Sequence, residues 1–121
     1  MNDLDNIDNN IRDILNESLV PNEKNKKYRG EVFTNLNVIE KQLFYLPEQI
    51  WKNPKLKILE PASGLGNYSI FCYYKFMKHL ISIPNLQKRS KHIIENMLYM
   101  VEIEKVNVDK CRNIFKLIDS S

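Results

Sequence analysis

The stretch that most constrains this chain is "ILEPASGLGNYSI", residues 58–70, where an apolar run meets two glycines separated by one residue. The run "LKILE" lies between two prolines and predicts a short buried strand over residues 56–60. Glycines after such a strand allow backbone N–H groups to approach a ligand, because no side chain blocks the way. The stretch therefore predicts a ligand site at a strand-to-helix turn.

The segments after the glycines alternate between helix and strand. Apolar residues at helical spacing predict a helix over 67–81 and a further helix, basic on one side, over 86–97. The run "LYMVEI", residues 98–103, predicts a second strand, and residues 108–118 have the spacing of a final helix. The order strand, helix, strand, helix is typical of a parallel sheet, so we expect an α/β protein.

The amino-terminal part differs in composition from the rest. Residues 1–27 are predicted to form a short amphipathic helix and a basic, solvated linker that contains "NEKNKK". A further helix is expected to begin near Thr34 or Asn35, since both residue types cap helices well. Residues 28–121 then form the folded domain. The apolar residues at helical spacing in the first segment are Leu4, Ile7, Ile11 and Ile14.

The composition excludes several classes of protein. Apolar residues make up 43% and charged residues 27% of the 121 positions, which is ordinary for a soluble domain. No apolar run is long enough to span a bilayer, so no membrane partner is expected. The start of the chain is acidic and polar, unlike a secretory signal, which favours the cytoplasm as its location. The net charge of +3 is too small to indicate nucleic-acid binding by itself.

Cysteine and histidine do not form a metal-binding pattern. Cys72 and Cys111 are far apart, with no second cysteine near either, and we expect two buried free thiols. His79 and His92 have no partner at ligand spacing and are expected to be ordinary surface residues. We therefore predict no metal site.

Two glutamates are the candidate ligand-binding acids. Glu60 ends the first predicted strand and Glu102 the second, at the edge where open parallel sheets bind ligands. The dinucleotide fingerprint needs a third glycine or an alanine at the position of Ser69. It also needs an acid about twenty residues after the turn, much closer to Glu60 than Glu102 is, so a dinucleotide is disfavoured. Two acids there suit an ammonium and a ribose diol, both present in S-adenosylmethionine. Alternatively, Glu102 is a solvated acid and the glycines only form a tight turn.

Three stretches in this order resemble a known family. They are "GEVFT" at 30–34, "LEPASGLGNY" at 59–68 and "YMVEI" at 99–103. Together they resemble the amino-terminal half of S-adenosylmethionine-dependent DNA adenine-N6 methyltransferases, particularly the phage and large-virus members. The resemblance extends roughly from Tyr28 to Phe115. It implies a partial Rossmann-like class I methyltransferase fold, a βαβα half with a helical amino-terminal extension.

The resemblance also implies roles for individual residues. Phe33 would pack on the cofactor with Thr34 beside it, although a hydrophobic staple before the helix explains Phe33 equally well. Glu102 would hold the ribose hydroxyls, and Ile103 would flank the adenine ring. The residues implied to cradle the methionine moiety are Glu60, Pro61, Ala62, Gly64, Gly66 and Asn67.

The chain departs from the family pattern at four cofactor-facing positions. Glu60 replaces an aspartate, Ser63 a cysteine, Leu65 a small polar residue and Asn35 a proline. Such changes are the pattern expected of relaxed constraint.

The catalytic motif of the family is missing. Transfer to adenine N6 needs Asn or Asp, two prolines and an aromatic residue, which together hold the flipped base. The only Asn-Pro pair, at 53–54, precedes the glycine turn, so we predict no catalytic residue. The sequence thus favours a truncated or split methyltransferase, with DNA as substrate of the intact family and a partner protein supplying the rest. The alternatives are a non-catalytic interaction module, a degenerate fragment or an unrelated nucleotide-binding α/β protein. For a viral protein, the location becomes the virion or the host cytoplasm.

Overall fold

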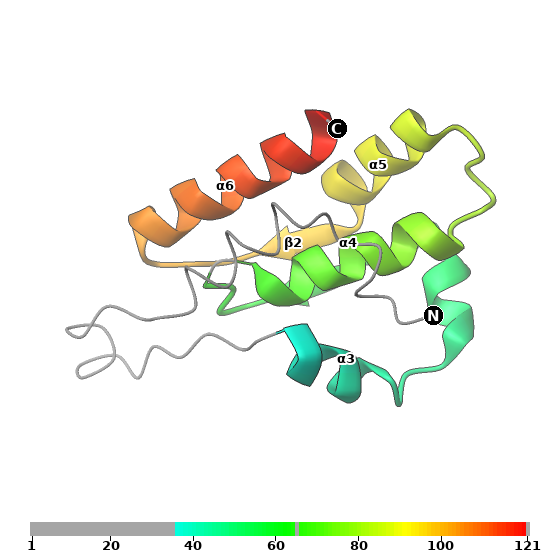
Figure 1. Ribbon diagram of the computed structural model, residues 1–121, viewed down its shortest axis with the longest axis horizontal. Helices are drawn as coiled ribbons and strands as arrows, with labels where there is room; N and C mark the ends of the chain where they lie inside the picture. Colours follow the sequence, from blue (N-terminus) through cyan, green and yellow to red (C-terminus); the bar gives the residue numbers. More distant parts are fainter. Residues whose placement is uncertain (1–35, 65, 121) are drawn as a thin grey trace.

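The computed structural model of the protein describes residues 36–64 and 66–120 and is a mixed α/β structure, as predicted (Figure 1). The predicted segment 1–27, together with Phe33, Thr34, Asn35 and Leu65, lies outside the described residues. The elements in chain order are α3 (Leu36–Leu43), the 3-10 helix η2 (Glu48–Lys52), β1 (Ile58–Glu60), α4 (Asn67–His79), α5 (Leu86–Asn96), β2 (Leu98–Met100) and α6 (Lys105–Ser120).

The two strands form a parallel sheet, which confirms the predicted order of elements. Leu59 pairs with Tyr99, and Glu60 pairs with Met100. Both strands are shorter than predicted. Before β1, the N–H of Leu56 donates to a turn carbonyl instead of the sheet. After β1, Pro61 has no N–H to donate, so the regular hydrogen-bond ladder between the two strands ends at Glu60.

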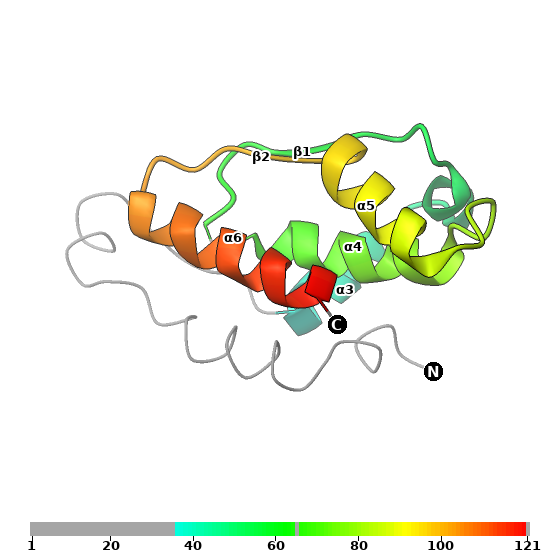
Figure 2. The same ribbon diagram turned by 90° about the horizontal axis from the view of Figure 1, so that it is seen from above.

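The helices cover one face of the sheet. Seen from above, α4, α5 and α6 all lie on the same side of β1 and β2 (Figure 2). Glu60 and Leu98 are buried toward this layer, whereas Leu59 and Tyr99 on the other face are 64% and 42% exposed. No described helix lies against that other face. A parallel sheet with apolar side chains on both faces is normally covered on both. Among the described residues, the face that carries Leu59 and Tyr99 is left bare.

Helix α4 is the centre of the core. It packs against α3, η2, α5 and both strands, so apolar side chains are buried on most of its circumference. The apolar residues at helical spacing account for only part of this buried surface, because Phe71, Cys72 and Phe76 are buried as well. Trp51 of η2 packs edge-on against Phe76, with ring centroids 5.0 Å apart. The predicted end of the helix was also wrong: α4 ends at His79, and Ile81 lies beyond it, exposed.

The surroundings of the two cysteines and of one histidine can be compared with the sequence predictions. Cys72 and Cys111 are buried free thiols, as predicted. His92 is not an ordinary surface residue, since it is half-buried and its Nε2 lies 2.7 Å from the carbonyl oxygen of Pro54. It ties α5 to the loop that precedes β1. Among the described residues, no helix has the length and apolar character needed to cross a membrane.

Candidate functional site

The glycine turn lies at the carboxyl end of the parallel strands, between β1 and α4. Gly64 and Gly66 have φ angles of 55° and 83°, in the left-handed region that favours glycine. The N–H of Gly66 donates to the carbonyl of Ser63 at 2.7 Å, and the N–H of Ser63 donates to the carbonyl of Val101 at 2.9 Å. These bonds fix the turn to the end of β2. The turn therefore has a defined position at the sheet edge where ligands bind in α/β proteins.

Gly66 also permits close packing of α6 on the turn. A Cβ atom at this position would lie 2.7 Å from Sγ of Cys111 and 3.2 Å from Sδ of Met100. The space beside its Cα is thus filled by side chains from α6 and β2. Any ligand contact of Gly66 would have to be made by its backbone.

Glu60 is a buried acid with one hydrogen-bonded oxygen. Its side chain is 9% exposed, and Oε2 accepts hydrogen bonds from the backbone N–H of Ser69 at 3.1 Å and from its hydroxyl at 3.3 Å. The N–H groups in the first turn of a helix have no intrahelical acceptor, so this carboxylate stabilises the start of α4. The other oxygen, Oε1, is buried with no hydrogen-bond partner among the described residues. Burial raises the pKa of Glu60 to about 7, although the bonds from Ser69 act in the opposite direction.

Glu102 lies two residues beyond the end of β2, so the prediction that it ends the second strand was wrong. Pairing with β1 stops at Met100, because Glu60 is the last paired residue on the other strand. The half-buried carboxylate of Glu102 accepts from the backbone N–H of Ile103 at 3.0 Å and from Nδ2 of Asn107 at 2.8 Å. It therefore orders the loop that leads into α6.

Both acids influence the pKa of Cys111 on α6. The sequence did not predict this relation. Burial and then the negative charge of Glu60 raise the pKa of the Cys111 thiol to about 11, with a further contribution from Glu102 and an opposing one from Arg112. Its Sγ lies 3.7 Å from Sδ of Met100. Both carboxylates thus act on one thiol beside the glycine turn. The helical spacing indicated that Cys111 is buried, but no local signal indicated its neighbours.

A pocket of about 420 Å³ opens beside the turn, between β2, α5 and α6. Ser63 and Glu102 contribute polar groups, Arg112 and Lys116 contribute positive charge, and most of the wall is apolar. Of the predicted cofactor residues that the structure describes, only Glu102 lines this pocket. Its apolar wall includes Ile94, Met100, Val108, Cys111 and Phe115.

The other predicted residues are distributed around the turn. Pro61 and Ala62 are exposed, Gly64 is half-buried and Asn67 is buried at the first position of α4. Ile103 is exposed and does not line the pocket. The structure therefore gathers Glu60, Gly66, Asn67 and Glu102 around one turn, whereas the side chain of Ile103 is exposed outside the pocket. Within residues 36–64 and 66–120, no group of three His, Cys, Asp or Glu residues is arranged to hold a metal ion.

Comparisons with protein-family models, with curated proteins and with solved structures give no match for this chain. Functional inference therefore depends on the residues of the site. These residues fit the methionine end of S-adenosylmethionine, because an unpartnered buried carboxylate oxygen suits an ammonium group. They also fit its ribose, because the carboxylate oxygens of Glu102 can each accept a further hydrogen bond.

Proposed function

We propose that this chain forms the S-adenosylmethionine-binding half of a DNA adenine-N6 methyltransferase, with a partial Rossmann-like class I sheet. The observation that carries the proposal is the buried Oε1 of Glu60 at the carboxyl end of β1, which has no partner among the described residues. A buried polar group left unpaired costs about 1–3 kcal/mol. An ammonium group beside Glu60 would remove this cost and favour the ionised carboxylate.

Glu102 is the second anchor of the proposed site. Its carboxylate, like that of Glu60, raises the pKa of the Cys111 thiol, and it borders an apolar pocket of about 420 Å³. In this proposal Glu102 accepts hydrogen bonds from the ribose hydroxyls, while the apolar side chains contact the adenosine. When bound, S-adenosylmethionine supplies an electrophilic methyl group. The residues of this chain hold and orient that donor.

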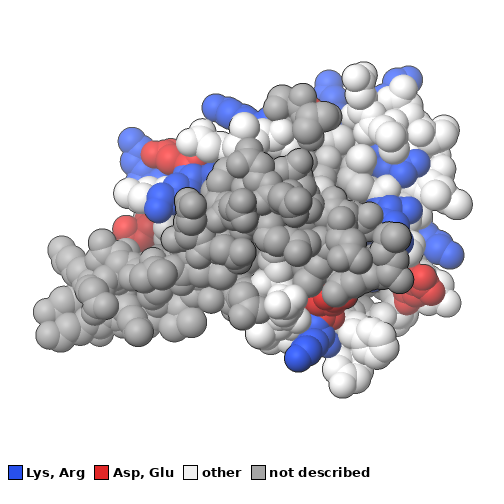
Figure 3. All heavy atoms as spheres, viewed as in Figure 1, with Lys and Arg blue, Asp and Glu red and all other residues white. Residues whose placement is uncertain are grey.

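The acceptor side of the reaction is assigned to residues outside this sequence. The sheet formed by the described residues has two strands and a bare face, and the sequence lacks the Asn-Pro-Pro-Tyr type of motif that would hold the target adenine. On the described part of the face in Figure 3, Lys and Arg side chains are spread along the margins with Asp and Glu among them. Because that motif is missing from this sequence, we assign binding of the target DNA to the part of the enzyme that completes the fold.

A second candidate function is a non-catalytic interaction module. The exposure of Leu59, Tyr99 and Val101 on the bare face favours it, because strand edges and apolar faces of this kind pair with other chains. Such a module would bind a protein partner whether or not S-adenosylmethionine is present. Binding of the cofactor by the chain alone distinguishes the two functions.

Calorimetric titration of S-adenosylmethionine into the full chain tests the proposal. We expect weak binding that Glu102→Ala reduces about tenfold or more, since a hydrogen bond to a charged group contributes about 1.5–3 kcal/mol. The matched control is Asp109→Ala, which removes an exposed carboxylate from α6, the helix that follows Glu102, and should leave the affinity unchanged. Equal heats in Glu102→Ala and the unaltered chain would show that another residue holds the ribose.

A further inference from the structure

Two side chains in the pocket of about 420 Å³ have bonding capacity that the protein does not use. They are the hydroxyl of Ser63 in the glycine turn and the guanidinium of Arg112 on α6. Among the described residues, Oγ of Ser63 has no hydrogen-bond partner and Arg112 has no ion pair. Ser63 is only 8% exposed, and a hydroxyl buried to that extent is normally hydrogen-bonded. The pocket therefore offers a donor and a cation to a ligand.

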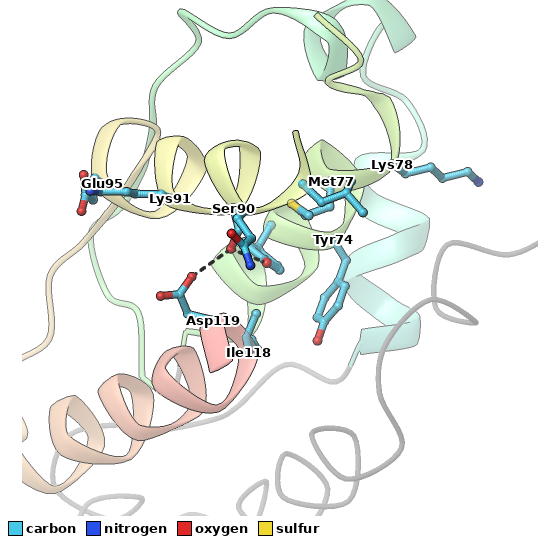
Figure 4. A pocket seen from close by; sticks show the side chains of 11 residues that line it. Tyr74, Met77, Lys78, Ser90, Lys91, Glu95, Ile118 and Asp119 are labelled. Carbon is cyan, nitrogen blue, oxygen red and sulfur yellow. Dashed lines mark hydrogen bonds between the residues drawn. The ribbon is translucent and has the colours of Figure 1, made fainter. Parts of the chain in front are cut away.

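A larger pocket, of about 830 Å³, differs in this respect. It lies between α4, α5 and the carboxyl-terminal end of α6 (Figure 4). There the hydroxyls of Tyr73 and Ser90 are 2.8 Å apart, and Oγ of Ser90 donates to Oδ1 of Asp119 at 3.2 Å. Figure 4 shows Asp119 on α6 turned toward Ser90 on α5. These three polar side chains satisfy one another, whereas the unused donor and cation line the smaller pocket.

Ser63 and Arg112 are positioned by the same turn that carries the proposed cofactor site. Ser63 follows Glu60 by three residues, and its carbonyl accepts from the N–H of Gly66 at 2.7 Å. Arg112 follows Cys111 on α6, and Sγ of Cys111 lies 2.7 Å from the place of a Cβ atom at Gly66. The turn and α6 thus bring the hydroxyl and the guanidinium to one pocket.

The proposed cofactor brings a carboxylate to this place. S-adenosylmethionine carries its ammonium and carboxylate groups on one carbon atom, so the carboxylate stays close to the ammonium that we assign to Glu60. Glu60 and Glu102 are both acids, and like charges repel a further carboxylate. A cation offsets this repulsion, and a guanidinium binds a carboxylate through two parallel N–H···O bonds. Arg112 supplies that cation, and Ser63 supplies an additional donor.

Lys116 is the other cation that lines the pocket. It lies one helical turn beyond Arg112 along α6 and therefore further from the loop that carries Glu102. Asp119, an acid, lines the same end of the pocket three residues later. Side chains three residues apart are neighbours on a helix, so Lys116 has a negative charge close to it. Arg112 is the cation nearer to the proposed site.

We propose that Arg112 and Ser63 bind the carboxylate of the methionine moiety and make the site selective for ligands with a complete amino-acid group. The inference rests on the proposed function, because the place of the carboxylate follows from the place assigned to the ammonium. The guanidinium and the hydroxyl both donate hydrogen bonds to the carboxylate. Glu60 and Arg112 then each recognise one charge of the zwitterion.

Calorimetric titration of the full chain with two ligands tests this proposal. The ligands are S-adenosylhomocysteine and its decarboxylated form, which keeps the ammonium group. The unaltered chain should bind S-adenosylhomocysteine at least about tenfold more tightly, because only this ligand has the carboxylate. Arg112→Gln should weaken the binding of S-adenosylhomocysteine about tenfold and that of the decarboxylated form less than about twofold. Ser63→Ala should act in the same direction with a smaller effect, because its hydroxyl is an uncharged donor.

Two further variants separate recognition of the carboxylate from a general effect of charge. Arg112→Lys keeps the positive charge without the fork of donors, so it should recover part of the selectivity. Lys110→Gln removes a positive charge from an exposed position of α6 that does not line the pocket, and both affinities should stay unchanged. Equal weakening by Lys110→Gln and Arg112→Gln would overturn the proposal, because distant charge would then explain the effect.

The pair of ligands also distinguishes failure of this inference from failure of the proposed function. Equal affinity of the unaltered chain for both ligands, or equal weakening of both by Arg112→Gln, would overturn the role of Arg112 and leave the cofactor site in place. Failure of the unaltered chain to bind either ligand would overturn both.

Discussion

Gly66→Ala is expected to lower the free energy of unfolding by about 3 kcal/mol, the largest effect of any small substitution near the turn. A left-handed conformation costs an alanine about 1–2 kcal/mol, and the new Cβ would lie 2.7 Å from Sγ of Cys111. Chemical denaturation of the full chain measures the change.

A double-mutant cycle separates the two causes. Cys111→Ala removes the closest atom, so Gly66→Ala should cost at least about 1 kcal/mol less in that background. A residual cost should remain, because the φ of 83° is unchanged by the second substitution. Unaltered stability of Gly66→Ala, or strictly additive effects, would show that α6 does not pack on the turn as described.

Glu60→Gln is expected to change how stability depends on pH. The pKa of Glu60 is about 7 in the folded chain and 4.5 in the unfolded reference, so the folded state binds the proton more tightly. The free energy of unfolding should therefore fall as pH rises from 4.5 to 7, by up to about 3 kcal/mol from this group. Glutamine does not titrate, so the stability of the variant relative to the unaltered chain should rise by that amount across the window.

Denaturation at a series of pH values provides the measurement. The matched control is Glu95→Gln, which removes an exposed carboxylate from α5 and should not reproduce the pH-dependent difference. A constant difference between Glu60→Gln and the unaltered chain from pH 4.5 to 8 would contradict a buried Glu60.

Much of the fold follows from local patterns. The apolar run and Pro61 predicted that β1 ends at Glu60, and the glycines predicted that a helix begins at Asn67. Alternation of helix and strand predicted the parallel sheet. These features depend on neighbours in sequence, which a single chain displays directly.

The features that sequence did not predict depend on contacts between distant residues. The end of β2 is fixed by where β1 stops, and this places Glu102 in a loop instead of a strand. The inward direction of Glu60 depends on Ser69, and the packing at Gly66 depends on Cys111. Helix α4 is buried on most sides because elements from both halves of the chain surround it. No local periodicity carries that information.

Glutamate has one methylene group more than aspartate, and this length has a structural consequence at position 60. With its additional methylene group, Glu60 reaches the N–H and hydroxyl of Ser69 in the first turn of α4. One carboxylate oxygen thereby stabilises the helix, and the other remains for a ligand. In the proposed function the same residue therefore positions the helix and binds the ammonium group.

The most direct test of the proposed site is a titration of the Glu60 carboxyl carbon by NMR, with Glu60→Gln used to assign the signal. The free chain should give a pKa near 7, and S-adenosylhomocysteine should lower it, because its ammonium group favours the ionised carboxylate. Methylthioadenosine, which lacks the ammonium and carboxylate groups, should leave the pKa unchanged. A pKa that does not move at saturating S-adenosylhomocysteine, or the absence of any binding, would contradict the assignment of Glu60 to the cofactor.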